Sequence, residues 1–390
     1  MSSKLNGVKT VAIFCGSKCN YNCVYCDRIP IKESVGYTAL RLKDVPQIVR
    51  FLEDISETVP CEECHKAPSV MDDDGNIIPD ICPSCNGTKT RNYLPIDTIS
   101  FFGGEPFLFF PVMEAVVEQV IAKWPKMFFF IQTNGSYLTE PDKETFIRKY
   151  AKNLRVSISH DFSFQSLNRT EFDIGAALTL LKDAKVDFVQ MQHVLPVNRP
   201  DAFSIDHVAS IVKIFARYKV DRLSLIPLRH IRGFGRFTTF VKEVPLDILF
   251  RKMLQLVHKL WVEGINVVVD GMEQAIEKSY FNDHKQLVIA PDGYLYPEFD
   301  FVEYKVHGAR VGEWLNKTEL NRSTNDDHLI WDKCKTCPAR NQCGIKYLYK
   351  MFSDEEPDGY CLHVNRMYMT IINHNLKLKK SKNLFDLVGI

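Results

Sequence analysis

Features that direct a chain into a membrane are absent from this sequence of 390 residues. Residues 1–10 contain no apolar core of the kind that an export signal has. The longest apolar run, residues 101–113, includes two glycines, a glutamate and two prolines. A membrane-spanning helix needs ~20 mostly apolar residues, so this run does not qualify. We therefore expect a cytoplasmic protein in a reducing compartment, without a membrane partner.

An excess of charge of either sign is also absent. The chain has 49 Lys and Arg residues against 48 Asp and Glu residues, a formal net charge of +1. Attraction of the whole chain to nucleic acid or to an anionic membrane is therefore not indicated. Hydrophobic residues make up 45% and charged residues 25%, an ordinary globular composition that argues against bulk disorder.

Short apolar strands alternate with amphipathic helices over the first part of the chain. Strands are expected at Thr10–Phe14, Thr98–Phe102, Met127–Gln132, Leu154–Ile158, Phe188–Val194 and Arg222–Pro227. Helices are expected at Arg41–Ile55, Val112–Trp124, after Thr139, at Phe172–Ala184 and at Ile205–Tyr218. This α/β pattern predicts a parallel sheet, open or closed into a barrel. In such folds the functional loops follow the carboxyl ends of the strands.

Two regions break the alternation. Residues 60–93 are rich in Cys, Asp, Gly and Pro, which indicates an insertion after the first helix. From about Ala290 the chain becomes rich in turn residues and then in cysteine. We therefore expect a core over residues 1–240 with an insertion at 60–93, a linking helix and strand region over 241–286, and a C-terminal domain over 287–390.

Twelve cysteines are present, and in a long chain without an export signal they favour metal sites over disulfides. Eleven of them form three separate groups. Cys15 stands apart and is expected to be a small buried hydrophobic residue in the first strand.

The first group, Cys19, Cys23 and Cys26, directly follows the first expected strand. Three thiolates on one short loop can hold three corners of a [4Fe–4S] cluster. The next strand ends in the sequence FGGEP at 102–106, where two glycines permit close backbone approach and a carboxylate can accept from an ammonium. Together with the aromatic Tyr25, these two motifs resemble those of the radical S-adenosylmethionine (SAM) superfamily.

The resemblance extends over roughly residues 9–240 and implies a partial (β/α)6 barrel of TIM type. It also implies a shared first step, in which a reduced cluster gives one electron to SAM and a 5′-deoxyadenosyl radical abstracts a substrate hydrogen. A reducing partner such as flavodoxin or ferredoxin is then needed. The SAM-binding residues that the resemblance implies are Tyr25, Gly103, Gly104, Glu105, Asn134 and Ser157.

The cysteines near the C-terminus follow a Pro-Asp-Gly turn that is expected between two short strands at residues 291–297. Their order resembles the SPASM/Twitch extension of radical SAM enzymes, which binds auxiliary clusters. No cysteine follows the turn closely, so the resemblance implies a Twitch-like domain with one auxiliary [4Fe–4S] cluster; a structural zinc site is the alternative. The four expected ligands are Cys334, Cys337, Cys343 and Cys361.

The insertion contains two C-x2-C knuckles separated by seventeen residues. This spacing is typical of a zinc-ribbon-like site, with Cys61, Cys64, Cys82 and Cys85 as ligands. A third iron–sulfur cluster is the alternative. The CxxCH pattern at residues 61–65 also fits covalent haem, but no export signal is present, and the second knuckle supplies the two thiolates that the first lacks for a zinc site. His65 is not expected to be a ligand.

A basic and aromatic segment follows the sixth expected strand. Its Arg229, Arg232 and Arg236 suit phosphate or carboxylate, although ion pairs with surface acids explain them equally. We expect a nucleotide or nucleobase substrate, modified or isomerised at a substituent; a peptide or protein substrate is the alternative. A non-catalytic, zinc-containing nucleic-acid-binding protein is the rival from another class, and the near-zero net charge and the GGEP sequence count against it.

Overall fold

The computed structural model describes residues 8–24, 26, 39–61, 70–71, 77–78, 90–196, 199–227, 246–269, 286–296, 302, 310, 312–315 and 319–320. Within them no helix is long and apolar enough to cross a membrane. Neither Tyr25 nor the three arginines of the basic segment belongs to these residues, and the four C-terminal cysteines lie outside them too.

The six expected strands are present and lie side by side in chain order. They are β1 (Thr10–Gly16), β6 (Thr98–Gly103), β7 (Phe128–Thr133), β8 (Leu154–Ser159), β9 (Phe188–Leu195) and β10 (Arg222–Pro227). All five neighbouring pairs are parallel, so the carboxyl ends of the strands lie at one edge of the sheet. This arrangement confirms the predicted α/β core.

The sheet continues past this core at both ends. β11 (Val267–Val269) adds in parallel to β10, and β12 (Gln286–Ile289) adds in parallel to β1. The sequence pattern did not predict that these two strands join the parallel sheet. Antiparallel strands then follow β12 in the order β13 (Tyr294–Tyr296), β14 (Gly312–Glu313) and β15 (Glu319–Leu320). The tight turn expected near residue 291 lies between β12 and β13, as predicted.

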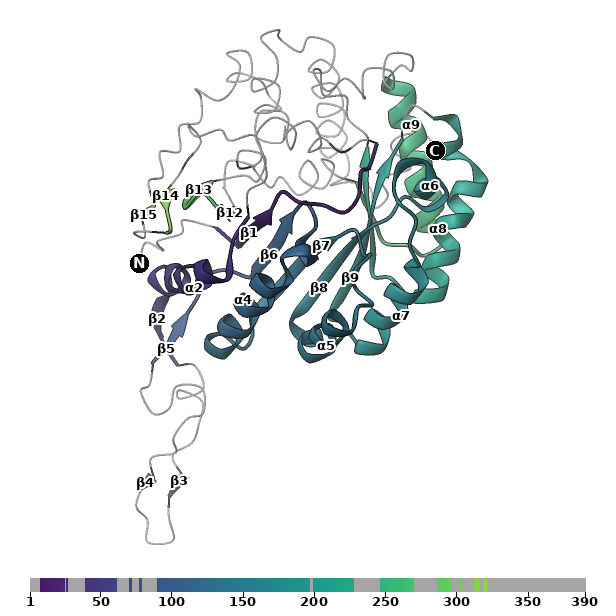
Figure 1. Cartoon of the computed structure of the whole chain (residues 1–390). Coiled ribbons are helices and arrows are strands. Elements are labelled where there is room, and N and C mark those ends of the chain that lie inside the picture. Colours follow the sequence, from purple (N-terminus) through teal and green to yellow (C-terminus); the bar gives the residue numbers. More distant parts are fainter. Residues whose placement is uncertain are drawn as a thin grey trace.

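Helices follow the strands and cover one side of the curved sheet (Figure 1). The α-helices are α2 (Val45–Asp54), α4 (Phe110–Lys123), α5 (Pro141–Tyr150), α6 (Gln165–Asn168), α7 (Ile174–Ala184), α8 (Ile205–Tyr218) and α9 (Leu246–Val262). Short 3-10 turns are η1 (Leu42–Asp44), η2 (Pro106–Phe109), η3 (Ala151–Asn153), η4 (Phe162–Phe164) and η5 (Pro200–Phe203). Side chains cap the N-termini of α7 and α8: the Asp173 side chain accepts a hydrogen bond from the Ala176 backbone N–H, and the Ser204 side chain accepts one from the His207 backbone N–H.

The two faces of the sheet differ in polarity because successive side chains of a strand point to opposite sides. On β8 and β9 the buried apolar residues Val156, Ile158, Val189 and Met191 belong to the main hydrophobic core. Cys15 of β1 belongs to the same core, as predicted, and burial raises the pKa of its thiol. The intervening residues of β6 to β9 include serine and glutamine. The sheet therefore has an apolar face under the helices and an inner face that carries its polar side chains together with several phenylalanines.

The insertion begins and ends in an antiparallel ribbon of two strands. β2 (Glu57–Pro60) pairs with β5 (Thr90–Tyr93), and farther along the chain β3 (Val70–Met71) pairs with β4 (Ile77–Ile78). Figure 1 shows the β2–β5 ribbon next to α2, at the end of the molecule away from α8. Cys61 directly follows β2 and is buried. Its three expected zinc partners, Cys64, Cys82 and Cys85, lie outside the described residues.

Candidate functional site

The loop after β1 carries the three cysteines of the C-x3-C-x2-C motif, none of which forms a disulfide. The pKa of Cys23 is raised to about 11, chiefly by burial; the positive charge of Arg169 acts against this rise, and the charges of Cys26 and Cys19 add to it. The three sulfurs are thus close enough to influence one another. A metal that binds them must displace the protons, and its charge lowers the pKa values of its thiol ligands.

This set of donors fits three corners of an iron–sulfur cluster. In the part of the chain that the structure describes, no group of three His, Cys, Asp or Glu side chains, including the cysteine loop, is arranged to hold one metal ion. A four-iron cluster presents a separate iron to each thiolate, so its ligands need not converge on one point. The zinc site and the auxiliary cluster stay predictions, since most of their expected ligands lie outside the described residues.

The GGEP segment lies directly against the start of the cysteine loop. The backbone N–H of Gly104 donates to the Gly16 carbonyl over 2.8 Å, and that of Glu105 donates to the Lys18 carbonyl over 2.9 Å. A Cβ on Gly103 would collide with the Gly16 oxygen, and one on Gly104 would collide with the Lys18 oxygen. Gly103 also has a φ of +140°, which favours glycine. Both glycines are therefore needed to place the backbone just before Cys19.

Glu105 is fully buried, and its carboxylate joins the ends of β6 and β7. Oε1 accepts from the Thr133 hydroxyl at 2.6 Å and from the Phe107 backbone N–H at 3.2 Å, while Oε2 accepts from the Asn134 backbone N–H at 2.7 Å. Burial raises the pKa of Glu105 to about 7, although these hydrogen bonds act in the opposite direction. Contact with the SAM ammonium stays a prediction; the geometry gives this carboxylate a second task, which is to brace the next loop.

Asn134, in the TNG sequence after β7, reaches back to the cysteine loop. Its Nδ2 donates to Asn20 Oδ1 at 2.8 Å and lies 3.9 Å from Cys19 Sγ. The Asn20 amide donates in turn to the Ser136 hydroxyl at 2.9 Å, and that hydroxyl donates to Asn134 Oδ1 at 2.7 Å. The sequence motifs indicated Asn134 but neither Asn20 nor Ser136. Their only signal was adjacency to Cys19 and to the TNG sequence.

Ser157 lies on the polar inner face of β8 and is fully buried. Its hydroxyl accepts from Gln190 Nε2 at 3.1 Å. One step nearer the carboxyl edge, Gln192 Oε1 accepts from Gln132 Nε2 at 2.6 Å and from the Ser159 hydroxyl at 3.2 Å. Hydrogen bonds thus connect the inner faces of β7, β8 and β9 beneath the loops. A SAM contact for Ser157 stays a prediction.

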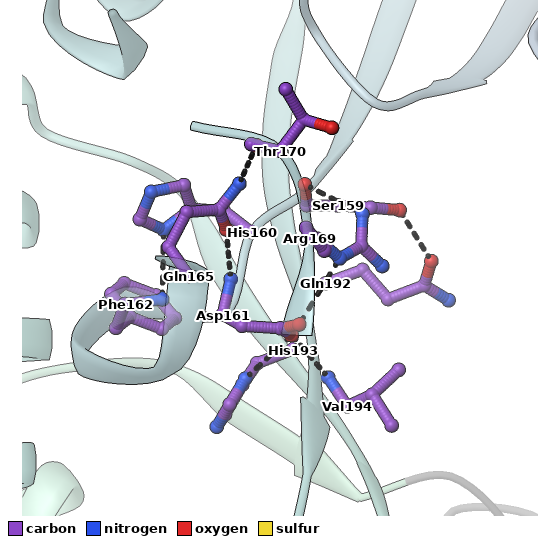
Figure 2. A network of polar contacts seen from close by, with 10 residues as sticks. All are labelled: Ser159, His160, Asp161, Phe162, Gln165, Arg169, Thr170, Gln192, His193 and Val194. Atoms are coloured by element: carbon purple, nitrogen blue, oxygen red, sulfur yellow. Dashed lines mark hydrogen bonds and ion pairs between the residues drawn. The ribbon is translucent and has the colours of Figure 1, made fainter. Parts of the chain in front are cut away.

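A network of polar and charged groups connects the segment after β8 with β9 (Figure 2). Asp161, two residues after β8, is fully buried, and its Oδ2 accepts from Arg169 Nε at 3.1 Å. Its Oδ1 accepts from the Val194 backbone N–H at 3.2 Å and lies 3.1 Å from His193 Nδ1. Arg169 Nη1 also donates to the Ser159 carbonyl at 3.1 Å. No motif in the sequence indicated this network.

The network connects to the cysteine loop through one backbone hydrogen bond. The N–H of Val24, between Cys23 and Cys26, donates to the carbonyl of Asn168 at 3.0 Å. Asn168 immediately precedes Arg169, which explains why this guanidinium is near enough to lower the pKa of Cys23. The loop is therefore fixed on one side by β6 and β7 and on the other by the segment after β8.

No protein-family model matches the chain, and no curated protein matches it. Solved structures do resemble it. A hexahistidine-tagged anSMEcpe with bound AdoMet has a TM-score of 0.62 at 17% identity, covering 98% of this chain and 97% of that one. Native anSMEcpe with bound AdoMet and Cp18Cys peptide has a TM-score of 0.61 at 18% identity, covering 95% and 99%. Streptococcus suis SuiB bound to precursor peptide SuiA has a TM-score of 0.56 at 16% identity, covering 87% and 71%.

At these identities the similarity establishes a shared fold. The chain has the mixed α/β architecture, with its large parallel sheet, of proteins whose structures were solved with AdoMet, that is SAM. It carries its cysteine loop, its GGEP sequence and its TNG sequence at the carboxyl ends of the first three core strands, where ligands bind in folds of this kind.

Proposed function

We propose that this protein is a radical SAM enzyme. The observation that carries the proposal is the convergence of three separate segments at one edge of the sheet. Cys19 lies next to Asn134, and the backbone before Cys19 accepts hydrogen bonds from the backbone N–H groups of Gly104 and Glu105. A non-catalytic zinc protein has no need for this convergence, nor for two glycines that bring the GGEP segment against the cysteine loop.

Three thiolates, from Cys19, Cys23 and Cys26, would hold the [4Fe–4S] cluster. When bound and reduced, such a cluster supplies the electron that cleaves SAM to a 5′-deoxyadenosyl radical. This chain's own residues would fix the site: Arg169 favours the thiolate form of Cys23, and Asn134 holds the cysteine loop through Asn20. The polar inner face of the sheet would orient the substrate below.

A peptide or protein is the substrate class that we propose. Two of the similar solved structures contain a peptide, Cp18Cys in one and SuiA in the other, and both cover most of this chain. The expected nucleotide substrate depended mainly on Arg229, Arg232 and Arg236, with the zinc-ribbon-like insertion as further support. The three arginines lie outside the described residues. The peptide alternative is therefore better supported than the nucleobase reading.

The remaining cofactors and partners belong to the same proposal. Cys334, Cys337, Cys343 and Cys361 would hold one auxiliary [4Fe–4S] cluster, and the four cysteines of the insertion would hold one zinc. A low-potential donor such as flavodoxin or ferredoxin would reduce the first cluster. These assignments depend on the cysteine spacing and on the resemblance of the motifs.

Anaerobic SAM cleavage tests the proposed function. Reconstituted protein with dithionite and SAM should form 5′-deoxyadenosine, and a Cys19→Ala/Cys23→Ala/Cys26→Ala triple variant should form none. Cleavage that survives in the triple variant, or none by the wild type with a full iron content, would contradict the proposal. Deuterated peptides and deuterated nucleotides, offered separately, should then show which class transfers its label to 5′-deoxyadenosine.

A further inference from the structure

A cavity of ≈ 540 Å³ lies along the inner face of the parallel sheet. At one end its walls include Phe102 and Gln132, which directly precede Gly103 and Thr133 of the site. At the other end they include Thr10, Thr98 and Arg222, the first residues of β1, β6 and β10. The cavity thus extends from the candidate site toward the opposite edge of the sheet. Its volume lies in the range of ~300–1,000 Å³ that is usual for ligand pockets.

Two arginines line this cavity, and only one of them has a counter-ion among the described residues. Arg155 Nε forms an ion pair with Asp187 Oδ2 at 3.0 Å, and its guanidinium lies 3.9 Å from the Phe128 ring centroid. Asp187 also lines the cavity, so these two charges cancel there. Serine and threonine hydroxyls from β1 and β6 add neutral hydrogen-bonding groups to the wall.

Arg222 is the other arginine, and its described partners are neutral. Its Nε donates to Gln190 Oε1 at 2.7 Å, and its guanidinium carbon lies 5.0 Å from the centroid of the Phe188 ring. These two contacts fix the plane of the guanidinium and leave its charge uncompensated within the described structure. A planar, oriented guanidinium is well suited to grip a carboxylate through two parallel hydrogen bonds.

We propose that this cavity binds a carboxylate of the peptide substrate, with Arg222 as its anchor. The inference rests on the proposed function, because it takes a peptide as the substrate that enters from the site. The carboxylate could belong to an Asp or Glu side chain or to the C-terminus of the peptide. Thr98 and Phe102 line opposite ends of the cavity on β6, and they are ~13 Å apart along the strand at ~3.3 Å per residue. The anchored group would therefore lie several residues' length from the reacting position, and Arg222 would select substrates by charge without touching the reacting atoms.

Selection from a synthetic peptide pool tests this inference. Full-length, anaerobically reconstituted protein with SAM is immobilised and exposed to random octapeptides, half of them amidated at the C-terminus. Mass spectrometry compares the retained peptides with the pool. We expect peptides with a carboxylate to be enriched by about tenfold over their amide counterparts, as for a charge-assisted hydrogen bond. Enrichment of Asp and Glu over Asn and Gln identifies a side-chain carboxylate, and enrichment of free over amidated C-termini identifies the terminus.

Substitutions at position 222 test whether Arg222 causes the enrichment. Arg222→Gln should abolish the enrichment, and Arg222→Lys, which keeps the charge without the planar fork, should retain only part of it. Arg217→Gln is the matched control, because Arg217 also stacks on an aromatic ring, Tyr218, but lies exposed on α8 outside the cavity. Circular dichroism verifies that each variant is folded. If Arg222→Gln does not fold, Arg222→Lys decides between the outcomes.

Two results would overturn the inference: equal retention of acidic and amide peptides by the wild type, or full enrichment in a folded variant at position 222. SAM cleavage by the wild type without peptide is measured in parallel. Normal cleavage without charge selection would count against this inference alone. Charge selection by a protein that never cleaves SAM would count against the proposed function alone.

Discussion

Two buried carboxyl groups brace the cysteine loop from opposite sides, and their surroundings differ. Among the described residues, the hydrogen-bond donors to Glu105 are neutral, the Thr133 hydroxyl and two backbone N–H groups, and burial raises its pKa to about 7. Asp161 has the guanidinium of Arg169 as a direct partner. A buried charge is stable when it is paired, whereas an unpaired one tends toward its neutral form. The two braces should therefore respond differently to mutation and to pH.

The largest effect is expected at Asp161. Asp161→Asn keeps the shape of the side chain but leaves the buried Arg169 without its counter-charge. The free energy of unfolding should therefore fall by about 3–5 kcal/mol. Urea denaturation of the apo protein measures this loss. Glu144→Gln on α5 is the control: it breaks the exposed pair between Glu144 and Arg148, so its cost should stay below about 0.5 kcal/mol. A similar small loss at both positions would show that the Asp161 network does not stabilise the fold.

The next effect is a pH dependence at Glu105. Its pKa is raised from 4.5 in the unfolded chain to about 7 in the folded protein, so ionisation opposes folding. The contribution of Glu105 to the free energy of unfolding is largest below pH 4.5. It is lost as pH rises through 7, and the loss is about 3 kcal/mol, because each unit of pKa difference between the folded and unfolded states is equivalent to ~1.36 kcal/mol. The difference in unfolding free energy between wild type and Glu105→Gln, measured from pH 4.5 to 8, should fall accordingly. A difference that does not change with pH would place the folded pKa near its ordinary value.

A side chain at Gly104 should have a smaller effect on stability but a marked effect on the binding of iron at the site. Gly104→Ala pushes against the Lys18 carbonyl, so we expect a loss of about 1–3 kcal/mol and a marked fall in the iron bound after reconstitution. Gly264→Ala is the matched control: its φ of +78° is also strained for alanine, but its new Cβ meets no atom within 4 Å. That variant should lose stability and keep its iron. Normal iron binding by folded Gly104→Ala would contradict the assigned contact.

The smallest effect is expected for the hydrogen bond between Asn20 and Asn134. This bond is neutral and partly buried, so a double-mutant cycle with alanine at both positions should give a coupling of about 0.5–1.5 kcal/mol. Thermal or urea unfolding of the four proteins provides the measurement. Simple additivity of the two single substitutions would mean that the amides do not hold the two loops together.

The sequence alone was enough to predict the core strands and to locate the cysteine loop and the GGEP sequence. The alternation of apolar residues is a local property, so it located all six core strands and the five helices that follow the first five of them. The cysteine loop and the GGEP sequence were also readable, because close backbone approach demands glycine and cluster binding demands thiolates at short spacing. Since parallel strands end at one edge, the sequence could also predict that both motifs lie at the same edge.

Only the tertiary structure decided what surrounds those motifs. Asp161, Arg169 and His193 come from separate elements, and no local spacing marks them as partners. The raised pKa of Glu105 likewise depends on burial by the whole fold. Arg222 begins a strand that was predicted correctly, yet its lack of a described counter-ion and its place in the cavity follow from the strands beside it. Such facts depend on contacts between distant residues, whereas periodicity and motif spacing record only what is near along the chain.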